Sequence, residues 1–172
     1  MGKSLIDIAK EVIQTESDSV LLLKDRIDQN FIDVCHTLKS CMGKIVLIGM
    51  GKSGHIAKKI SSTLASTGTP AFYLHPGEAG HGDLGMVSHD DVVIMISYSG
   101  ESDEIIALLP GIKRMNVPII SMTGNAKSSI ASSSDFHMDV SVDKEACPHN
   151  LAPTSSTTVA LVMGDAIAVS LI

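Results

Sequence analysis

The sequence predicts an α/β fold, a three-layer sandwich in which helices cover a five-stranded parallel sheet. Short runs of branched apolar residues, typical of strands buried on both faces, recur along the chain. Segments with helical apolar spacing separate these runs, and such alternation is typical of parallel sheets. Ligands of such folds bind beyond the carboxyl ends of the strands, so the segments after each strand are the candidates for function.

Composition indicates one globular domain. Hydrophobic residues make up 44% of the 172 residues and charged residues 19%, which is enough apolar material for a full core. The net charge of −6, without a basic stripe, argues against a nucleic-acid partner. No apolar run approaches the length of a membrane span. Three cysteines without a CxxC pair fit a reducing compartment. We therefore expect a single cytoplasmic domain, residues 1–172, with no membrane contact.

Residues 4–42 are expected to form a helical pair ahead of the first strand. Ser4 to Asp7 resembles a capping box, and apolar residues then recur at helical spacing up to Val20. A second helical pattern runs from Ile27 to Met42, with Gly43 as its stop. The apolar stripes of this pair could cover the sheet or pack against another subunit.

Residues 44–172 form the predicted α/β core. Strands are expected at residues 44–48, 71–74, 92–96, 117–122 and 136–140. Helices are expected after the first, third and fourth strands. The helix after the fourth strand starts at Ser128, and a final helix begins at Thr154. Pro110 should bend the helix that follows the third strand. Residues 75–88 form a long glycine-rich connection, which is a candidate functional segment.

Residues 49–54 match the dinucleotide fingerprint GxGxxG in a strand–turn–helix context. That interpretation requires an acidic residue after the second strand, where His75 stands instead. A P-loop is also excluded, because Val46 occupies the position of its first glycine. The turn can still bring Lys52 and Ser53 close to an anionic ligand. The alternative is a lysine on a solvated helix start.

Residues 97–104 combine three serines with a predicted helix start. Ser97, Ser99 and Ser102 can surround a phosphate with neutral donors, and Ser102 can cap the helix. The alternative is an ordinary serine-capped turn. Glu101 and Glu104 beside such an anion site suggest that one of them acts as a base.

Three further groups carry candidate chemistry. His75 and His81 flank Glu78 in a segment whose proline and glycines argue against helical HExxH zinc chemistry. Glu145 lies in the polar loop 143–153. Residues 154–158 are five hydroxyl residues that open the last helix, either as a second donor-rich terminus or simply as N-capping and solubilising residues.

These blocks together resemble the sugar isomerase (SIS) domain, and more closely the arabinose-5-phosphate isomerases. The similarity is carried in one order by residues 49–54, 75–85, 97–102, 144–148 and 154–158, and it covers essentially the whole chain. It implies a flavodoxin-like fold. It also implies interconversion of D-ribulose 5-phosphate and D-arabinose 5-phosphate, which feeds synthesis of Kdo in lipopolysaccharide.

The resemblance also implies which residues act. The catalytic positions are Lys52, Glu104, Glu145 and His81. The substrate-binding positions are Ser53, Gly68, Thr69, His75, His81, Ser97, Ser99 and Ser102. No cofactor is required, although His75 can hold an inhibitory zinc ion. The family assembles as homo-oligomers, either tetramers or dimers. Its members continue beyond the last helix into a further catalytic histidine and a pair of CBS domains, so a chain ending at Ile172 is expected to have reduced activity.

The residue types suit an enediol mechanism. We expect Glu104 to move the carbon proton, Glu145 or His81 to move the proton between the oxygens, and Lys52 to stabilise the enediolate. The phosphate is then a binding handle remote from the reacting carbons. Roles within this set are interchangeable on the sequence alone. Two other functions remain open, a non-catalytic regulatory domain that binds sugar phosphates and a nucleotide-binding module.

Overall fold

The computed structural model describes residues 3–172 and contains one five-stranded sheet. All neighbouring strands are parallel, in the order β2-β1-β3-β4-β5. This is the flavodoxin-like order, and it confirms the predicted fold class. The strands are β1 (Ile45–Gly49), β2 (Ala71–Leu74), β3 (Val92–Ile96), β4 (Ile119–Thr123) and β5 (Phe136–Asp139).

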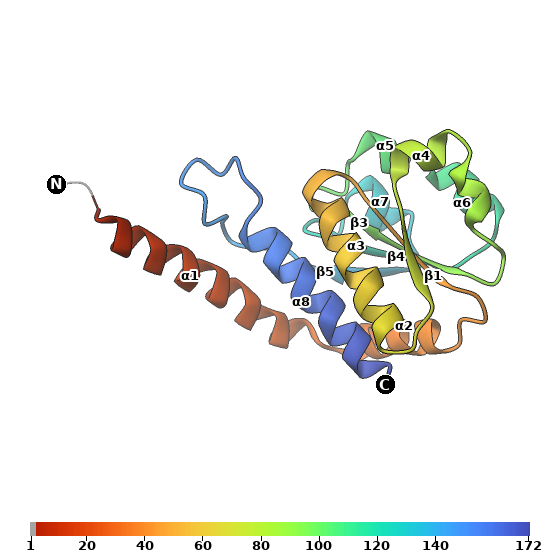
Figure 1. Ribbon diagram of the computed structural model, residues 1–172, viewed down its shortest axis with the longest axis horizontal. Helices are drawn as coiled ribbons and strands as arrows, with labels where there is room; N and C mark the ends of the chain where they lie inside the picture. Colours follow the sequence, from red (N-terminus) through yellow and green to blue (C-terminus); the bar gives the residue numbers. More distant parts are fainter. Residues whose placement is uncertain (1–2) are drawn as a thin grey trace.

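Helices cover both faces of this sheet and make three layers (Figure 1). One face carries α2 (Gln29–Lys39), α3 (Gly51–Ser66) and α8 (Ser155–Ser170) over a core that includes Ile94 and Met163. The other face carries α4 (Pro76–Gly80), α5 (Asp103–Ile106), α6 (Leu109–Arg114) and α7 (Ser129–Ser132) over a second core that includes Met95 and Ile112. Because successive strand side chains point to opposite faces, the uninterrupted apolar strands supply both cores.

The first helix, α1 (Leu5–Leu21), packs on α8 and not on the sheet. Ser4 caps it as expected, with the Ser4 hydroxyl accepting the Asp7 N–H at 3.1 Å. The Thr158 hydroxyl donates to Glu16 at 2.9 Å and ties the two helices together. A short 3₁₀ segment, η1 (Leu22–Arg26), leads to α2, which does cover the sheet through Phe31, Val34 and Leu38. Within residues 3–172, no helix is both long and apolar enough to cross a bilayer.

The connection over residues 75–88 contains α4 and a 3₁₀ turn, η2 (Asp83–Met86). A short helix therefore forms although the proline and glycines disfavour one, and His75 and His81 lie at its two cap positions, six residues apart and not in HExxH spacing. Pro76 stands in the first turn of α4, where its missing N–H costs nothing. His75 caps this turn, its Nδ1 accepting the Gly77 N–H at 3.1 Å.

Pro110 has a stronger effect than a bend. The helix expected after β3 is divided into α5 and α6, and Pro110 lies in the first turn of α6. The proline nitrogen cannot donate a backbone hydrogen bond, and proline is tolerated only at a helix start, so a new helix begins there.

The strand order creates a switch point between β1 and β3 at the carboxyl ends of the strands. β1 and β3 are neighbours with Gly49 opposite Ile96, and their following helices leave to opposite faces. Such a switch point opens a crevice for ligands.

Candidate functional site

The segment after β3, residues 97–102, forms a loop of serine hydroxyls, here named the phosphate loop. Ser97 accepts the Gly100 N–H at 3.2 Å, and Ser99 accepts the Glu101 N–H at 3.2 Å. The Ser97 and Ser102 hydroxyls lie 2.8 Å apart. Ser102 is the N-cap residue of α5, as expected, but its side chain makes no hydrogen bond to that helix. Backbone N–H groups occupy lone pairs of Ser97 and Ser99, and one hydroxyl of the Ser97–Ser102 pair donates to the other. The Ser99 O–H and the second O–H of that pair are left to donate to an anion.

The phosphate loop is braced against α7. Gly100 has a φ of +68°, and a side chain there would clash with the Ser128 side chain. The Glu101 carboxylate accepts the Ser129 N–H at 2.7 Å. Hydrogen bonding from Ser129 holds the pKa of Glu101 below its usual value. Glu101 is therefore a structural cap, which leaves Glu104 as the available carboxylate of this pair.

The turn after β1 carries Lys52 and Ser53 at the start of α3. Gly51 begins the helix with a φ of +55°. The Tyr73 hydroxyl donates to the Gly49 carbonyl at 2.9 Å and fixes the turn from the side of β2. Lys52 is exposed, and no ion pair or hydrogen bond engages its side chain within residues 3–172. Its charge is free to meet an anionic ligand.

Glu104 and the two histidines lie on neighbouring short helices. Glu104 is exposed in the first turn of α5, and His75 and His81 flank α4, which contacts α5. In the described part of the chain, the side chains of Glu104 and His81 have no hydrogen-bond or ion-pair partner. A base and an acid that are accessible and unengaged are what proton transfer to a bound substrate requires.

Glu145 has a different environment, because its carboxylate caps α8. One carboxylate oxygen accepts the Thr154 N–H at 2.8 Å, the Thr154 hydroxyl at 2.9 Å and the Ser156 N–H at 3.3 Å. The other oxygen accepts the Ser156 hydroxyl. Burial works to raise the pKa of Glu145, but these hydrogen bonds outweigh it and lower the pKa. In this conformation Glu145 is a committed acceptor and not a free base.

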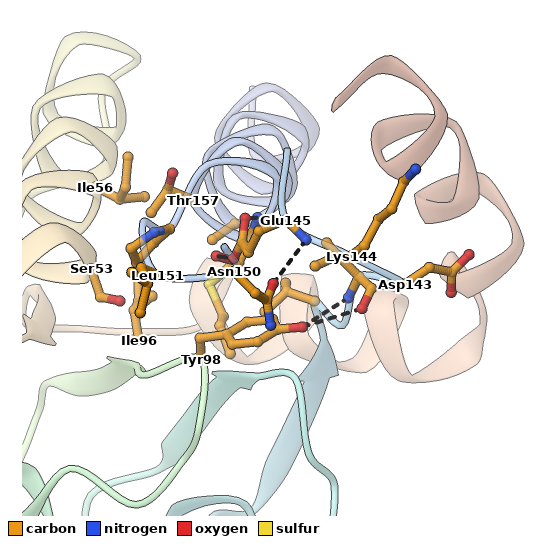
Figure 2. Close-up of a pocket in the computed structure, with 16 residues that line it drawn as sticks. Ser53, Ile56, Ile96, Tyr98, Asp143, Lys144, Glu145, Asn150, Leu151 and Thr157 are labelled. Atoms are coloured by element: carbon orange, nitrogen blue, oxygen red, sulfur yellow. Dashed lines mark hydrogen bonds between the residues drawn. The ribbon is translucent and has the colours of Figure 1, made fainter. Parts of the chain in front are cut away.

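A cavity of about 240 Å³ lies beside Ser53 and Glu145, between the first turns of α3 and α8 and the 140–154 segment (Figure 2). Ser53, Tyr98 and Glu145 contribute polar groups to its wall, so the cavity connects the phosphate loop with the Glu145 segment. Its remaining lining residues are Ile56, Ile96, Met122, Val140, Val142, Asp143, Lys144, Asn150, Leu151, Pro153, Ser156, Thr157 and Ala160.

Most of the expected site residues lie at one edge of the sheet, but two do not. Lys52, Ser53, His75, His81, Ser97, Ser99, Ser102, Glu104 and Glu145 all follow the carboxyl ends of strands. Gly68 and Thr69 follow the end of α3 and precede β2, at the opposite edge, where Pro70 pairs with Ile45. A single chain therefore does not bring Gly68 and Thr69 to the other residues.

The environment of His75 bears on the expected zinc ion. Among residues 3–172, no group of three or more His, Cys, Asp or Glu side chains could hold a metal. The Nδ1 atom of His75 is already an acceptor for Gly77. A zinc ion at His75 would need ligands beyond those that one chain assembles here.

Sequence reasoning missed Tyr98. This residue lies between Ser97 and Ser99, and its ring and hydroxyl form part of the cavity wall (Figure 2). Its position inside the serine loop is the signal that could have identified it. The capping of α8 by Glu145 was also missed, although the hydroxyl run 154–158 stands out in the sequence. The bond joins residues nine positions apart through a loop, which no helical or strand periodicity predicts.

The chain is similar to known proteins over most of its length. The family model described as SIS domain matches residues 38–170. The sequence is 58% identical over 163 residues to "Arabinose 5-phosphate isomerase KdsD" of Escherichia coli K12, covering 95% of this chain and 50% of that protein. It is 53% identical to the protein of the same name from Pseudomonas aeruginosa, covering 97% of this chain and 51% of that protein. The chain thus spans about half the length of these curated relatives.

A solved structure is similar over nearly its full length. The c3406 protein of E. coli CFT073, in complex with arabinose 5-phosphate, superposes with a TM-score of 0.94 at 48% sequence identity. The superposition covers 99% of this chain and 92% of that one. The described fold is therefore the fold of a protein that has been seen with that ligand.

Proposed function

The chain belongs to the SIS domain family, and on that premise we propose that it interconverts D-ribulose 5-phosphate and D-arabinose 5-phosphate through an enediol. One observation carries the proposal. The serine hydroxyls of the phosphate loop share a sheet edge with a lysine, a glutamate and a histidine whose side chains are unengaged within residues 3–172. The names of the relatives, arabinose 5-phosphate isomerases, support the choice of substrate.

The substrate is bound through its phosphate group. The hydroxyls of Ser97, Ser99 and Ser102 donate to its oxygens, and Ser53 at the start of α3 closes the seat from the side of β1. The protein carries a net charge of −6, so its overall charge does not attract an anion. The dipoles of the hydroxyl groups and of the helix start supply the local attraction instead. Binding at the phosphate end orients C1 and C2 without touching them.

The carbon chemistry follows from the accessible groups. Glu104 removes the proton from C2 of the open-chain aldose, exchanges it with solvent and delivers a proton to C1, while Lys52 stabilises the negative charge on the enediolate oxygen. The oxygens must exchange one proton, with O1 gaining it and O2 losing it. His81 is the better shuttle in this conformation, because both oxygens of Glu145 are occupied by α8. His81 also serves to open the furanose ring, and His75 contacts the substrate. No step requires a cofactor.

The wider context extends the proposal. The product supplies synthesis of Kdo for lipopolysaccharide, the protein acts in the cytoplasm, and it works as a homo-oligomer. Gly68 and Thr69 would then meet substrate only where a second subunit brings them to a neighbouring site, since their own chain holds them at the far sheet edge.

Turnover tests the proposal directly. The 172-residue chain is incubated with ribulose 5-phosphate and the formation of arabinose 5-phosphate is followed. We expect turnover, and a decrease in kcat of roughly 10²–10⁴-fold in Glu104→Gln, as for the loss of a general base. Asp103→Asn, an exposed carboxylate one position earlier on α5, is the matched control and should retain most activity. Turnover that is equal in both variants would exclude Glu104 as the base. A wild-type chain that binds the sugar phosphate without converting it would favour the regulatory alternative.

A further inference from the structure

Two segments that are far apart in the sequence meet at Tyr98. One is the phosphate loop, which contains this residue, and the other is the 140–154 segment, which carries Glu145 (Figure 2). The Tyr98 hydroxyl accepts the Val142 N–H at 3.2 Å and donates to the Val142 carbonyl at 3.3 Å. A single side chain therefore satisfies both backbone groups of a residue three positions before Glu145.

Tyr98 is itself fixed at its base. Its carbonyl accepts the Gly124 N–H at 2.8 Å. The ring lies so close to Gly124 that a Cβ atom there would be 2.7 Å from the ring carbon Cε2. The aromatic ring is therefore held between the end of β4 and the Val142 backbone, although 37% of the residue is exposed. A side chain clamped at both ends transmits a displacement of one segment to the other.

Within residues 3–172, the hydrogen bonds that tie residues 141–144 to elements other than the preceding β5 come from two side chains, those of Arg26 and Tyr98. Arg26 donates to the Ser141 carbonyl at 2.7 Å from the side of the N-terminal helices. The Asn150 side chain accepts the Glu145 N–H at 3.4 Å, but Asn150 belongs to the same loop. Within residues 3–172, the Tyr98 hydroxyl is the side-chain group that joins the phosphate loop to this segment.

We infer that Tyr98 is a positioning residue that couples the phosphate loop to the Glu145 segment, so that phosphate held by the serines fixes the far wall of the cavity. The inference rests on the proposed function for the identity of the phosphate-bearing ligand. Tyr98 itself touches neither reacting carbon. Its effect is on the position of residues 142–145 in the cavity wall, while the Glu145 carboxylate stays bonded to the first turn of α8. A displacement of about 1 Å in groups that position a substrate can cost two orders of magnitude in rate.

Tyr98→Phe removes the hydroxyl and keeps the ring. We expect kcat for ribulose 5-phosphate to fall roughly 5–50-fold while KM and the inhibition constant of inorganic phosphate stay within about 2-fold of wild type. An unchanged kcat would overturn the inference. The inference would also be overturned if kcat stayed constant while both KM and the phosphate inhibition constant increased, because Tyr98 would then contribute to phosphate binding alone.

A second measurement does not depend on turnover. Amide hydrogen exchange at Val142 and Glu145 is measured with and without inorganic phosphate. We expect phosphate to slow exchange of these two amides in the wild type and to have no such effect in Tyr98→Phe. Tyr73→Phe is the matched control, since it loses a hydroxyl that bonds a different carbonyl, that of Gly49, and it should behave as wild type at Val142. Equal protection in wild type and Tyr98→Phe would contradict the coupling even if the isomerase assignment holds. A wild-type chain without turnover, but with protection that Tyr98→Phe abolishes, would contradict the assignment and leave the coupling standing.

Discussion

Three glutamates of the proposed site, Glu101, Glu104 and Glu145, have three different environments, and these environments separate their roles. Glu101 accepts a backbone N–H from α7, Glu145 accepts four hydrogen bonds from the start of α8, and Glu104 is exposed. A carboxylate that is saturated with donors is a poor proton acceptor, because protonation would cost it those bonds. At the scale of single residues, the structure thus favours Glu104 as the carbon base and makes Glu145 a cap.

The cap at Glu145 predicts a pH dependence of stability. Because the folded-state pKa is lowered, the carboxylate stabilises the fold above its unfolded-state pKa of about 4.3, and this contribution is lost as the pH falls through the lower folded-state value. Glu145→Gln should therefore lower the free energy of unfolding by roughly 1–2 kcal/mol near pH 7, in the range of a lost helix cap. Thermal melts from pH 7 to pH 3 should show this difference constant down to about pH 5 and shrinking below about pH 4.5.

The control is Glu78→Gln. The Glu78 side chain is exposed, and within residues 3–172 its carboxylate accepts no hydrogen bond. It should change stability little at any of these pH values. A wild-type advantage over Glu145→Gln that grows as the pH falls would contradict the lowered pKa.

At the scale of elements, the sequence predicts most accurately where burial decides the structure. The runs 45–49 and 92–96 are buried along their whole length, so composition alone identifies them as central strands. Prediction from the sequence fails where a few local hydrogen bonds override the intrinsic helix propensity of the residues. Residues 76–80 form a helix because Pro76 stands in its first turn and His75 caps it, although glycine and proline disfavour helix elsewhere. The serine loop could be predicted, but the bracing of that loop by α7 could not, since it joins residues 28 positions apart.

This bracing predicts the effect of a side chain at Gly100. Gly100→Ala combines a positive φ with a clash against Ser128, so we expect the free energy of unfolding to fall by roughly 2–4 kcal/mol and phosphate binding to be lost. Gly51→Ala is the control, because it also has a positive φ but no atom lies within 4 Å of the added carbon. It should cost only about 1 kcal/mol. Urea unfolding measures both, and equal losses would show that the contact with Ser128 carries no energy.

At the scale of the whole molecule, the chain builds two cores and leaves an apolar surface of α1 uncovered. The N-terminal half of α1 projects beyond α8 (Figure 1), and Leu5, Ile6 and Ile13 are 85%, 66% and 66% exposed. The sequence alone does not decide whether the stripes of the N-terminal pair face the sheet or another subunit. α2 covers the sheet, whereas α1 does not, because α8 lies between α1 and the sheet. Periodicity predicts that an apolar face exists but not what it contacts.

The uncovered face predicts association through α1. Sedimentation at micromolar concentration should give a mass above 18.1 kDa. Leu5→Asp combined with Ile13→Asp should shift the mass toward that of the monomer, because burying a carboxylate in an apolar contact is costly. Lys10→Asp, which changes a polar exposed position of the same helix, should leave the mass unchanged. A wild-type chain that sediments as a monomer would contradict the proposed homo-oligomer.

The central claim is an enediol isomerase built on a serine phosphate seat, and proton exchange tests it most directly. Arabinose 5-phosphate is incubated with the chain in D₂O and followed by NMR. The account predicts that ribulose 5-phosphate appears with deuterium at C1, and that deuterium enters C2 of the remaining aldose, because the carbon proton passes through an exchangeable carboxyl group. It also predicts that both signals are lost in Glu104→Gln. Ribulose 5-phosphate formed without any deuterium would contradict the carboxylate base, and the absence of both conversion and exchange would contradict the isomerase itself.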